Sequence, residues 1–176
     1  MNSLFSEYRP KTWNAIIGHG QVKASVNSMK RRGLGGRAFC FSGPSGCGKT
    51  TCAYVLAAEA CDPDNFIEVD ATDVTPAKLD ELEKLLRYKC IGKKSGRAVI
   101  INEIHGLRKD TIRKLLVVLE RVPNHVVWCF TMTDAGKDEL FKSIDSHPLI
   151  SRCISFELSP PVELFSQYVK MVAERE

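Results

Sequence analysis

The eight residues from 43 to 50 have the types and spacing to bind phosphate. They read Gly43-Pro44-Ser45-Gly46-Cys47-Gly48-Lys49-Thr50 and match the pattern G-x-x-x-x-G-K-[ST]. Glycines let backbone amides approach phosphate oxygens, and a helix that follows them turns its positive N-terminal end to the same anion. Lys49 can reach the β- and γ-phosphates, and the Thr50 hydroxyl can ligate Mg²⁺. The loop, with Thr51 after it, is therefore predicted to bind ATP and Mg²⁺.

A second candidate site follows the apolar run 99–101. In proteins with such a loop, an acidic residue here holds Mg²⁺ through water, and the next carboxylate polarises the attacking water. Glu103 fills the second role, whereas Asn102 stands where an aspartate is expected. Asn102 is either a weakened metal ligand or a strand-end residue that satisfies backbone groups. We expect weaker Mg²⁺ binding and slower hydrolysis, with nucleotide binding retained because Thr50 remains.

Two further side chains lie near these motifs in the sequence. Thr133, at the end of a fourth apolar run, is predicted to sense the γ-phosphate, although threonines are also simply common in strands. His105 follows Glu103 by two residues, and a histidine at the start of a helix is more often structural. We therefore do not assign His105 to the site.

The elements that must position these residues alternate along the chain. The predicted strands are 38–41, 66–70, 98–101, 126–131 and 153–158, and the predicted helices are 49–60, 76–89 and 107–121. Strands that alternate with helices form a parallel sheet with right-handed crossovers. The predicted fold class is therefore α/β, with a five-stranded parallel sheet.

The composition is typical of a globular domain. The chain has 176 residues, of which 44% are hydrophobic and 26% are charged. Its net charge of +4 permits a nucleic-acid partner without requiring one. No apolar run approaches the roughly 20 residues of a membrane span, so we expect no membrane partner. Seven scattered cysteines without a C-x-x-C pair indicate reduced thiols rather than a zinc module.

With these motifs in order, the sequence resembles the AAA+ ATPase module of DNA-polymerase sliding-clamp loaders, from about residue 8 to residue 158. Residues 8–13 (Tyr-Arg-Pro-Lys-Thr-Trp) and 16–19 (Ile-Ile-Gly-His) are similar to the N-terminal box of that family, which usually has glutamine in place of His19. The resemblance implies that four residues contact the adenine: Tyr8, Arg9, Ile17 and Gly18.

The triplet Ser-Arg-Cys at 151–153, immediately before the fifth strand, is typical of clamp loaders. The resemblance implies that Arg152 is a finger that reaches the γ-phosphate bound to a neighbouring subunit, where it neutralises transition-state charge. The alternative for Arg152 is a surface salt bridge, but the earlier matches favour the finger. Asp70 is implied to take the place of a polar residue that contacts the catalytic glutamate.

The resemblance also implies an architecture and a function. Residues 1–158 are expected to form a three-layer P-loop NTPase (AAA+) domain, and 159–176 a linker and the first helix of a lid that is otherwise absent. The implied activity is an ATPase, weak in isolation, that loads a sliding clamp in DNA replication with ATP and Mg²⁺. The implied partners are other AAA+ clamp-loader subunits, the clamp and primed double-stranded DNA, in the cytoplasm at the nucleoid or in the nucleus.

Several alternatives remain open. Asn102 is compatible with a clamp-loader subunit or regulator that binds ATP but hydrolyses it poorly. Another DNA-repair AAA+ ATPase, such as a branch-migration motor, shares the N-terminal box but matches Ser-Arg-Cys less clearly. A P-loop small-molecule kinase would need an acceptor site and an arginine-rich lid, and we find neither. Four cations suit either contact with the DNA backbone or a solvated helix face: Arg108, Lys109, Arg113 and Lys114.

Overall fold

The computed structural model describes residues 8–141, 147–159, 166, 169–170 and 173. Its strands are β1 (Arg37–Ser42), β2 (Phe66–Asp70), β3 (Arg97–Asn102), β4 (Val126–Met132) and β5 (Cys153–Glu157). Its α-helices are α2 (Gly20–Lys30), α3 (Lys49–Ala60), α4 (Pro76–Leu86), α5 (Lys109–Leu119), α6 (Asp134–Phe141) and α7 (His147–Ser151). Short 3₁₀ turns are η1 (Trp13–Ala15), η2 (Pro63–Asn65), η3 (Ala71–Asp73) and η4 (Ile104–Gly106). All five predicted strands are present.

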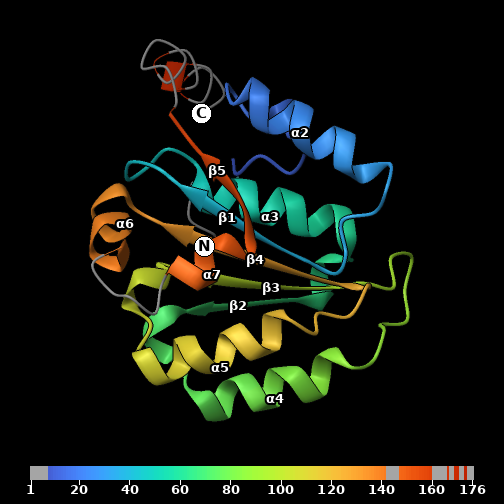
Figure 1. The fold of residues 1–176 in the computed structure, drawn as a ribbon. Coiled ribbons are helices and arrows are strands. Elements are labelled where there is room, and N and C mark those ends of the chain that lie inside the picture. Colours follow the sequence, from blue (N-terminus) through green and yellow to red (C-terminus); the bar gives the residue numbers. More distant parts are fainter. Residues whose placement is uncertain (1–7, 142–146, 160–165, 167–168, 171–172, 174–176) are drawn as a thin grey trace.

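The five strands form one parallel sheet in the order β2-β3-β4-β1-β5. The apolar runs at β1, β3 and β4 suit strands that are covered on both faces. The helix that follows β1, α3, packs on one face of the sheet. After β4 the chain goes on to α7, which packs on the opposite face of the sheet (Figure 1). Ligands bind at such a change of direction, outside the carboxyl ends of the strands.

Helices cover both faces of the sheet, which confirms the predicted three-layer α/β architecture. One core cluster joins α2 and α3 to the sheet, with Val26, Leu56 and Phe39 buried in it. The other joins α4, α5 and α7 to the opposite face, with Leu79 and Leu115 fully buried. Figure 1 shows α3 and the pair α4 and α5 on opposite sides of the strands.

Two helices are shorter than the sequence predicts. Helix α4 was expected to reach Lys89 but ends at Leu86, because the chain must turn back to begin β3. In this turn the Cys90 amide donates to the Ser95 carbonyl, and Arg97 Nε donates to the Tyr88 carbonyl. Helix α5 is two residues shorter at each end than predicted, and it begins at Lys109 because Leu107 and Arg108 have extended backbones. The predicted lid segment lies mostly outside the described residues.

The cysteines are unpaired, and most of them are buried. All seven cysteines are free. Burial raises the pKa of Cys40, Cys52 and Cys61 to about 12, so these thiols stay protonated at neutral pH. Among the helices that the structure describes, none has the length and apolar character to span a bilayer.

Candidate functional site

The predicted phosphate-binding loop joins β1 to α3 and has a backbone that requires glycine. Gly43, Gly46 and Gly48 have φ values of 149°, 77° and 93°. A Cβ on Gly43 would lie 2.3 Å from the Leu158 carbonyl oxygen, so the loop packs closely on the chain that follows β5. A Cβ on Gly46 or Gly48 would have no heavy atom within 4 Å. One side of the loop is therefore open to a ligand.

Lys49 begins α3, and its side chain turns back over the loop. Its Nζ donates to the carbonyl oxygens of Gly43 at 3.1 Å and Pro44 at 2.8 Å. The side chain is buried, which places an ammonium group inside the curve of the loop. Main-chain amides at the start of α3, together with this ammonium group, give a concentrated site of positive potential suited to an anion.

Asn102, at the carboxyl end of β3, connects three elements. Its Oδ1 accepts from the hydroxyls of Thr131 at 3.1 Å and Thr50 at 3.5 Å, and its Nδ2 donates to Glu68 Oε1 at 2.7 Å. The structure thus brings together Thr50 and Asn102, the two residues predicted to hold the metal. Both present oxygen atoms, which are the ligands that Mg²⁺ prefers, so these residues fit such an ion.

Glu103, the predicted water-activating base, has a left-handed backbone with φ 53° and ψ 54°. A non-glycine residue in this region is strained, and such strain clusters at functional sites. Its amide donates to Thr131 Oγ1 at 3.2 Å, and its carboxylate Oε2 lies 3.4 Å from His105 Nδ1. His105, which we did not assign to the site, therefore lies beside the predicted base.

Thr131 in β4 and Thr133 just after it have different hydrogen-bond partners. Thr131 is buried and contacts Asn102 and Glu103, as described above. Thr133, the predicted γ-phosphate sensor, accepts a hydrogen bond from the Gly136 amide at 3.1 Å at the start of α6. Thr133 comes directly after β4, and β4 lies beside β1, the strand that leads into the phosphate-binding loop. A γ-phosphate sensor would have to lie at this end of the sheet.

The N-terminal segment packs against the loop and against α3. His19 Nε2 donates to the Cys47 carbonyl at 3.1 Å, which ties this segment to the loop. Burial lowers the pKa of His19, so the neutral ring is favoured. The Arg9 guanidinium carbon lies 4.5 Å from the centroid of the Tyr54 ring in α3. The adenine contacts of Tyr8, Arg9, Ile17 and Gly18 stay a prediction.

Arg152, the predicted finger, lies between α7 and the edge strand β5. Its side chain is 35% exposed and pairs with Glu120 at 2.7 Å, and its other terminal nitrogen donates to the Pro148 carbonyl at 3.0 Å. The guanidinium is therefore held at the surface of its own chain. Its ion-pair partner Glu120 is exposed as well, so this pair lies where a neighbouring molecule could reach it.

A carboxylate that the sequence reasoning did not assign contacts the predicted metal site. The resemblance implied a polar contact from Asp70 of β2, but Asp70 makes no hydrogen bond or ion pair with Glu103 in the described structure. Two residues earlier, Glu68 binds Asn102 and also accepts from the Tyr54 hydroxyl. The alternation of side chains along a strand could have indicated Glu68, since residues 68 and 70 share one face of β2.

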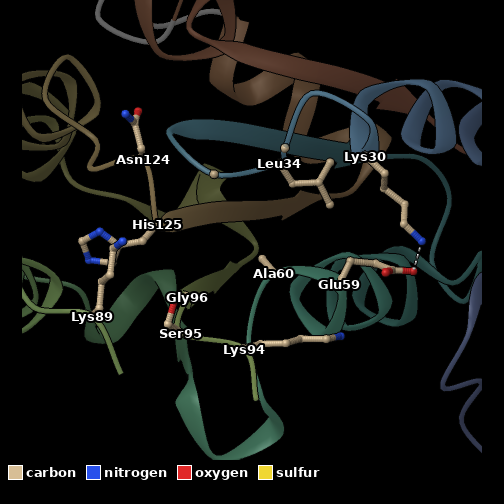
Figure 2. Close-up of a pocket in the computed structure, with 12 residues that line it drawn as sticks. Lys30, Leu34, Glu59, Ala60, Lys89, Lys94, Ser95, Gly96, Asn124 and His125 are labelled. Atoms are coloured by element: carbon tan, nitrogen blue, oxygen red, sulfur yellow. Dashed lines mark ion pairs between the residues drawn. The ribbon is translucent and has the colours of Figure 1, made fainter. Parts of the chain in front are cut away.

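A cavity of about 420 Å³ lies away from the phosphate-binding loop. It is bordered by the carboxyl ends of α2 and α3 and by the amino ends of β3 and β4, and Lys30, Lys89 and Lys94 line it. Lys30 Nζ lies 2.8 Å from Glu59 Oε1, and Figure 2 shows this ion pair at one side of the cavity. None of the predicted site residues lines this cavity, so it is not the predicted nucleotide site.

Comparisons with known proteins agree with this geometry. The profile of the family "ATPase family associated with various cellular activities (AAA)" matches residues 39–157. The replication factor C small subunit 1 of Pyrobaculum aerophilum is 28% identical over 98% of this chain and 52% of its own length. The DNA polymerase III subunit gamma of Buchnera aphidicola subsp. Baizongia pistaciae is 29% identical over 89% of this chain and 46% of its own.

Solved structures share the fold. The Thermotoga maritima RuvB Holliday junction branch migration motor superposes with a TM-score of 0.69 and 24% identity, over 93% of this chain and 53% of that one. The chain thus spans about half the length of the relatives that it matches. Because the family profile covers most of the chain, including the phosphate-binding loop and the ends of β3 and β4, the chain belongs to the AAA family of ATPases.

Proposed function

We propose that this chain is the nucleotide-binding module of a clamp-loader-type AAA+ ATPase, which binds ATP with Mg²⁺ and loads a sliding clamp onto DNA in replication. The observation that carries the proposal is the similarity to replication factor C small subunits along 98% of the chain. The open glycine loop with Lys49 inside it supports the ATP site. The proposed partners are other AAA+ clamp-loader subunits, the clamp and primed double-stranded DNA, in the cytoplasm or the nucleus.

Each residue of the site has a proposed step. The Lys49 ammonium group leaves the carbonyl oxygens of Gly43 and Pro44 and donates instead to the β- and γ-phosphate oxygens, which carry more negative charge. Glu103 accepts the proton of the water that attacks the γ-phosphorus, and Thr133 donates a hydrogen bond to the γ-phosphate. Thr50 and Asn102 would hold Mg²⁺, which would supply positive charge to neutralise the phosphate oxygens. The amides of residues 43–51 orient the anion throughout.

Arg152 is proposed to complete the site of an adjacent subunit. Its position at the edge of the sheet and its exposure support a role outside its own chain. An arginine that reaches the γ-phosphate neutralises the charge that develops as the terminal bond breaks. A site formed in this way is incomplete in a single chain, and hydrolysis by the isolated chain should be slow.

The charges of α5 bear on the proposed DNA contact. Lys114 pairs with Asp80 at 2.6 Å and lies 3.9 Å from Glu83, and Arg108 pairs with Asp110 at 3.1 Å. These acidic partners reduce the positive charge that α5 can offer to phosphate groups. The DNA partner is therefore proposed from the similarity to replication proteins rather than from this helix.

A second candidate function is a subunit that binds ATP and hydrolyses it poorly. The observation that favours it is Asn102, whose neutral amide stands where a metal-binding carboxylate is expected. In this alternative ATP stabilises the assembly and Arg152 acts on a partner's nucleotide. Measured turnover in the assembled state separates the two functions.

A mixing experiment tests the proposal. Lys49→Ala removes the loop lysine but leaves the finger, and Arg152→Ala removes the finger but leaves the loop. Each variant alone should lose about 10³-fold or more of the ATPase rate of the assembled wild-type chain, as loss of an arginine finger does. Their mixture should recover activity, because composite sites then form between the two kinds of subunit.

Sedimentation with ATP and Mg²⁺ shows whether the mixed chains assemble. Glu120→Ala is the control, since it removes the intrachain partner of Arg152 and leaves the finger itself. This variant should retain wild-type activity. An Arg152→Ala variant that is as active as the wild-type assembly would contradict the proposed finger.

A further inference from the structure

The side-chain amide of Asn102 has two unlike ends, and each has its own partner. The NH₂ end donates to Glu68 Oε1 at 2.7 Å, whereas Oδ1 accepts from the hydroxyls of Thr131 and Thr50. An ionised carboxylate accepts hydrogen bonds and cannot donate them, so Glu68 can pair only with the NH₂ end. Glu68 therefore determines that the oxygen of Asn102 faces Thr50.

Glu68 is itself held at both of its carboxylate oxygens. Oε1 accepts from Asn102 of β3, and Oε2 accepts from the hydroxyl of Tyr54 in α3. Tyr54 lies four residues after Thr50, one helical turn along the same face of α3. The carboxylate is thus fixed from two elements, directly behind the pair Thr50 and Asn102.

This orientation matters because an amide is a poorer cation ligand than a carboxylate. An aspartate at position 102 would present an oxygen whichever way its side chain turned, and it would carry a negative charge. An asparagine presents one oxygen and has no charge, and its NH₂ hydrogens would repel a cation if the amide were turned over. Partners behind a metal ligand commonly fix its orientation.

We propose that Glu68 is a positioning residue of the Mg²⁺ site, which turns the Asn102 oxygen toward Thr50 and supplies the negative charge that position 102 lacks. This inference rests on the proposed binding of ATP with Mg²⁺. It requires one carboxylate and one amide at positions 68 and 102. Two carboxylates at hydrogen-bond distance disfavour each other's ionisation, so a second one should not simply add to the first.

The test is a cycle of four proteins: wild type, Glu68→Gln, Asn102→Asp and the double variant. Mn²⁺, which replaces Mg²⁺ and is visible by electron paramagnetic resonance, is titrated in the presence of a saturating nonhydrolysable ATP analogue. The affinity of the analogue is measured separately in EDTA. Glu68→Gln should weaken Mn²⁺ binding about tenfold, a typical effect of losing a partner behind a ligand, and should leave the metal-free affinity unchanged.

The remaining variants separate positioning from general destabilisation. The double variant exchanges the carboxylate and the amide, and it should bind Mn²⁺ at least as tightly as wild type and more tightly than either single variant. Glu81→Gln is the matched control, because Glu81 is 68% exposed and, among the residues described, pairs with Lys78 on the same helix α4. It should bind Mn²⁺ as wild type does.

Two results would overturn the inference. One is unchanged Mn²⁺ affinity in Glu68→Gln, and the other is equal affinity in Asn102→Asp and the double variant, which would make Glu68 a bystander. If the wild-type chain failed to bind the analogue even in EDTA, the proposed function itself would fail, and this inference with it. Wild-type binding together with an insensitive Glu68→Gln variant would contradict the inference alone.

Discussion

At the scale of single residues, one edge of the sheet collects side chains from distant parts of the sequence. Thr50 lies in the first turn of α3, Asn102 ends β3 and Thr131 lies in β4, yet both threonine hydroxyls donate to Asn102 Oδ1. His19 adds a fourth segment, because its ring donates to the Cys47 carbonyl inside the loop. The loop conformation therefore depends on a histidine whose pKa burial lowers below its ordinary value.

We predict that His19 makes the stability of the domain depend on pH. Burial, the main cause, and the nearby Lys23 lower its pKa below the ordinary value of 6.5. The unfolded chain therefore takes up a proton that the folded chain resists, and the free energy of unfolding should fall as the pH drops below about 6.5. Glutamine keeps a donor without a titration, so His19→Gln should lose less stability on acidification.

Urea unfolding of both proteins at about pH 7.5 and pH 5.5 measures this difference. Other titrating groups affect the two proteins alike, so the comparison isolates position 19. Equal losses in the two proteins would show that His19 carries no such dependence.

The phosphate-binding loop could be predicted from the sequence, whereas the contact of Glu68 with Asn102 could not. The loop is contiguous, and its spacing alone indicates phosphate chemistry. Glu68 and Asn102 lie 34 residues apart, and their contact depends on the register in which Asp70 pairs with Asn102 across β2 and β3. Such a register is set by packing of the whole sheet, so the sequence indicated the strands but not this contact.

At the scale of elements, amphipathic helices attach to a sheet that is buried on both faces. Helix α5 turns Ile112, Leu115 and Val118 to the sheet, and Val117 of the same helix is 50% exposed. The sequence predicted a helix over 107–121, because helical periodicity is a local property. Its start was predicted two residues too early, because Leu107 and Arg108 form an extended link between η4 and α5 that no local pattern marks.

Paired substitutions in α5 measure how much the packed face contributes. Leu115 is fully buried, so Leu115→Ala should lower the free energy of unfolding by about 2–5 kcal/mol through lost burial and a cavity. Val117→Ala on the exposed face should change it by about 0.5 kcal/mol or less. Chemical denaturation measures both, and similar losses in the two variants would contradict the assignment of the two faces.

At the scale of the whole molecule, the sheet places the phosphate-binding loop and the predicted finger at opposite ends of two neighbouring parallel strands. Strand β1 carries the loop and lies beside β4, whereas β5 is an outer strand with Arg152 at its start. Alternating strands and helices predicted the parallel sheet, but they do not specify which strands are neighbours. An exposed arginine just before an outer strand suits contact between subunits, as the proposed function requires.

The claim on which this account depends is that the triphosphate binds at residues 43–50. Calorimetric titration of the chain with a nonhydrolysable ATP analogue and Mg²⁺ tests it directly. We expect saturable binding of one analogue per chain, weakened more than about tenfold by Lys49→Ala and unchanged by Lys78→Ala, an exposed lysine of α4. No binding at about 1 mM analogue, or equal binding by the Lys49→Ala variant, would contradict the account.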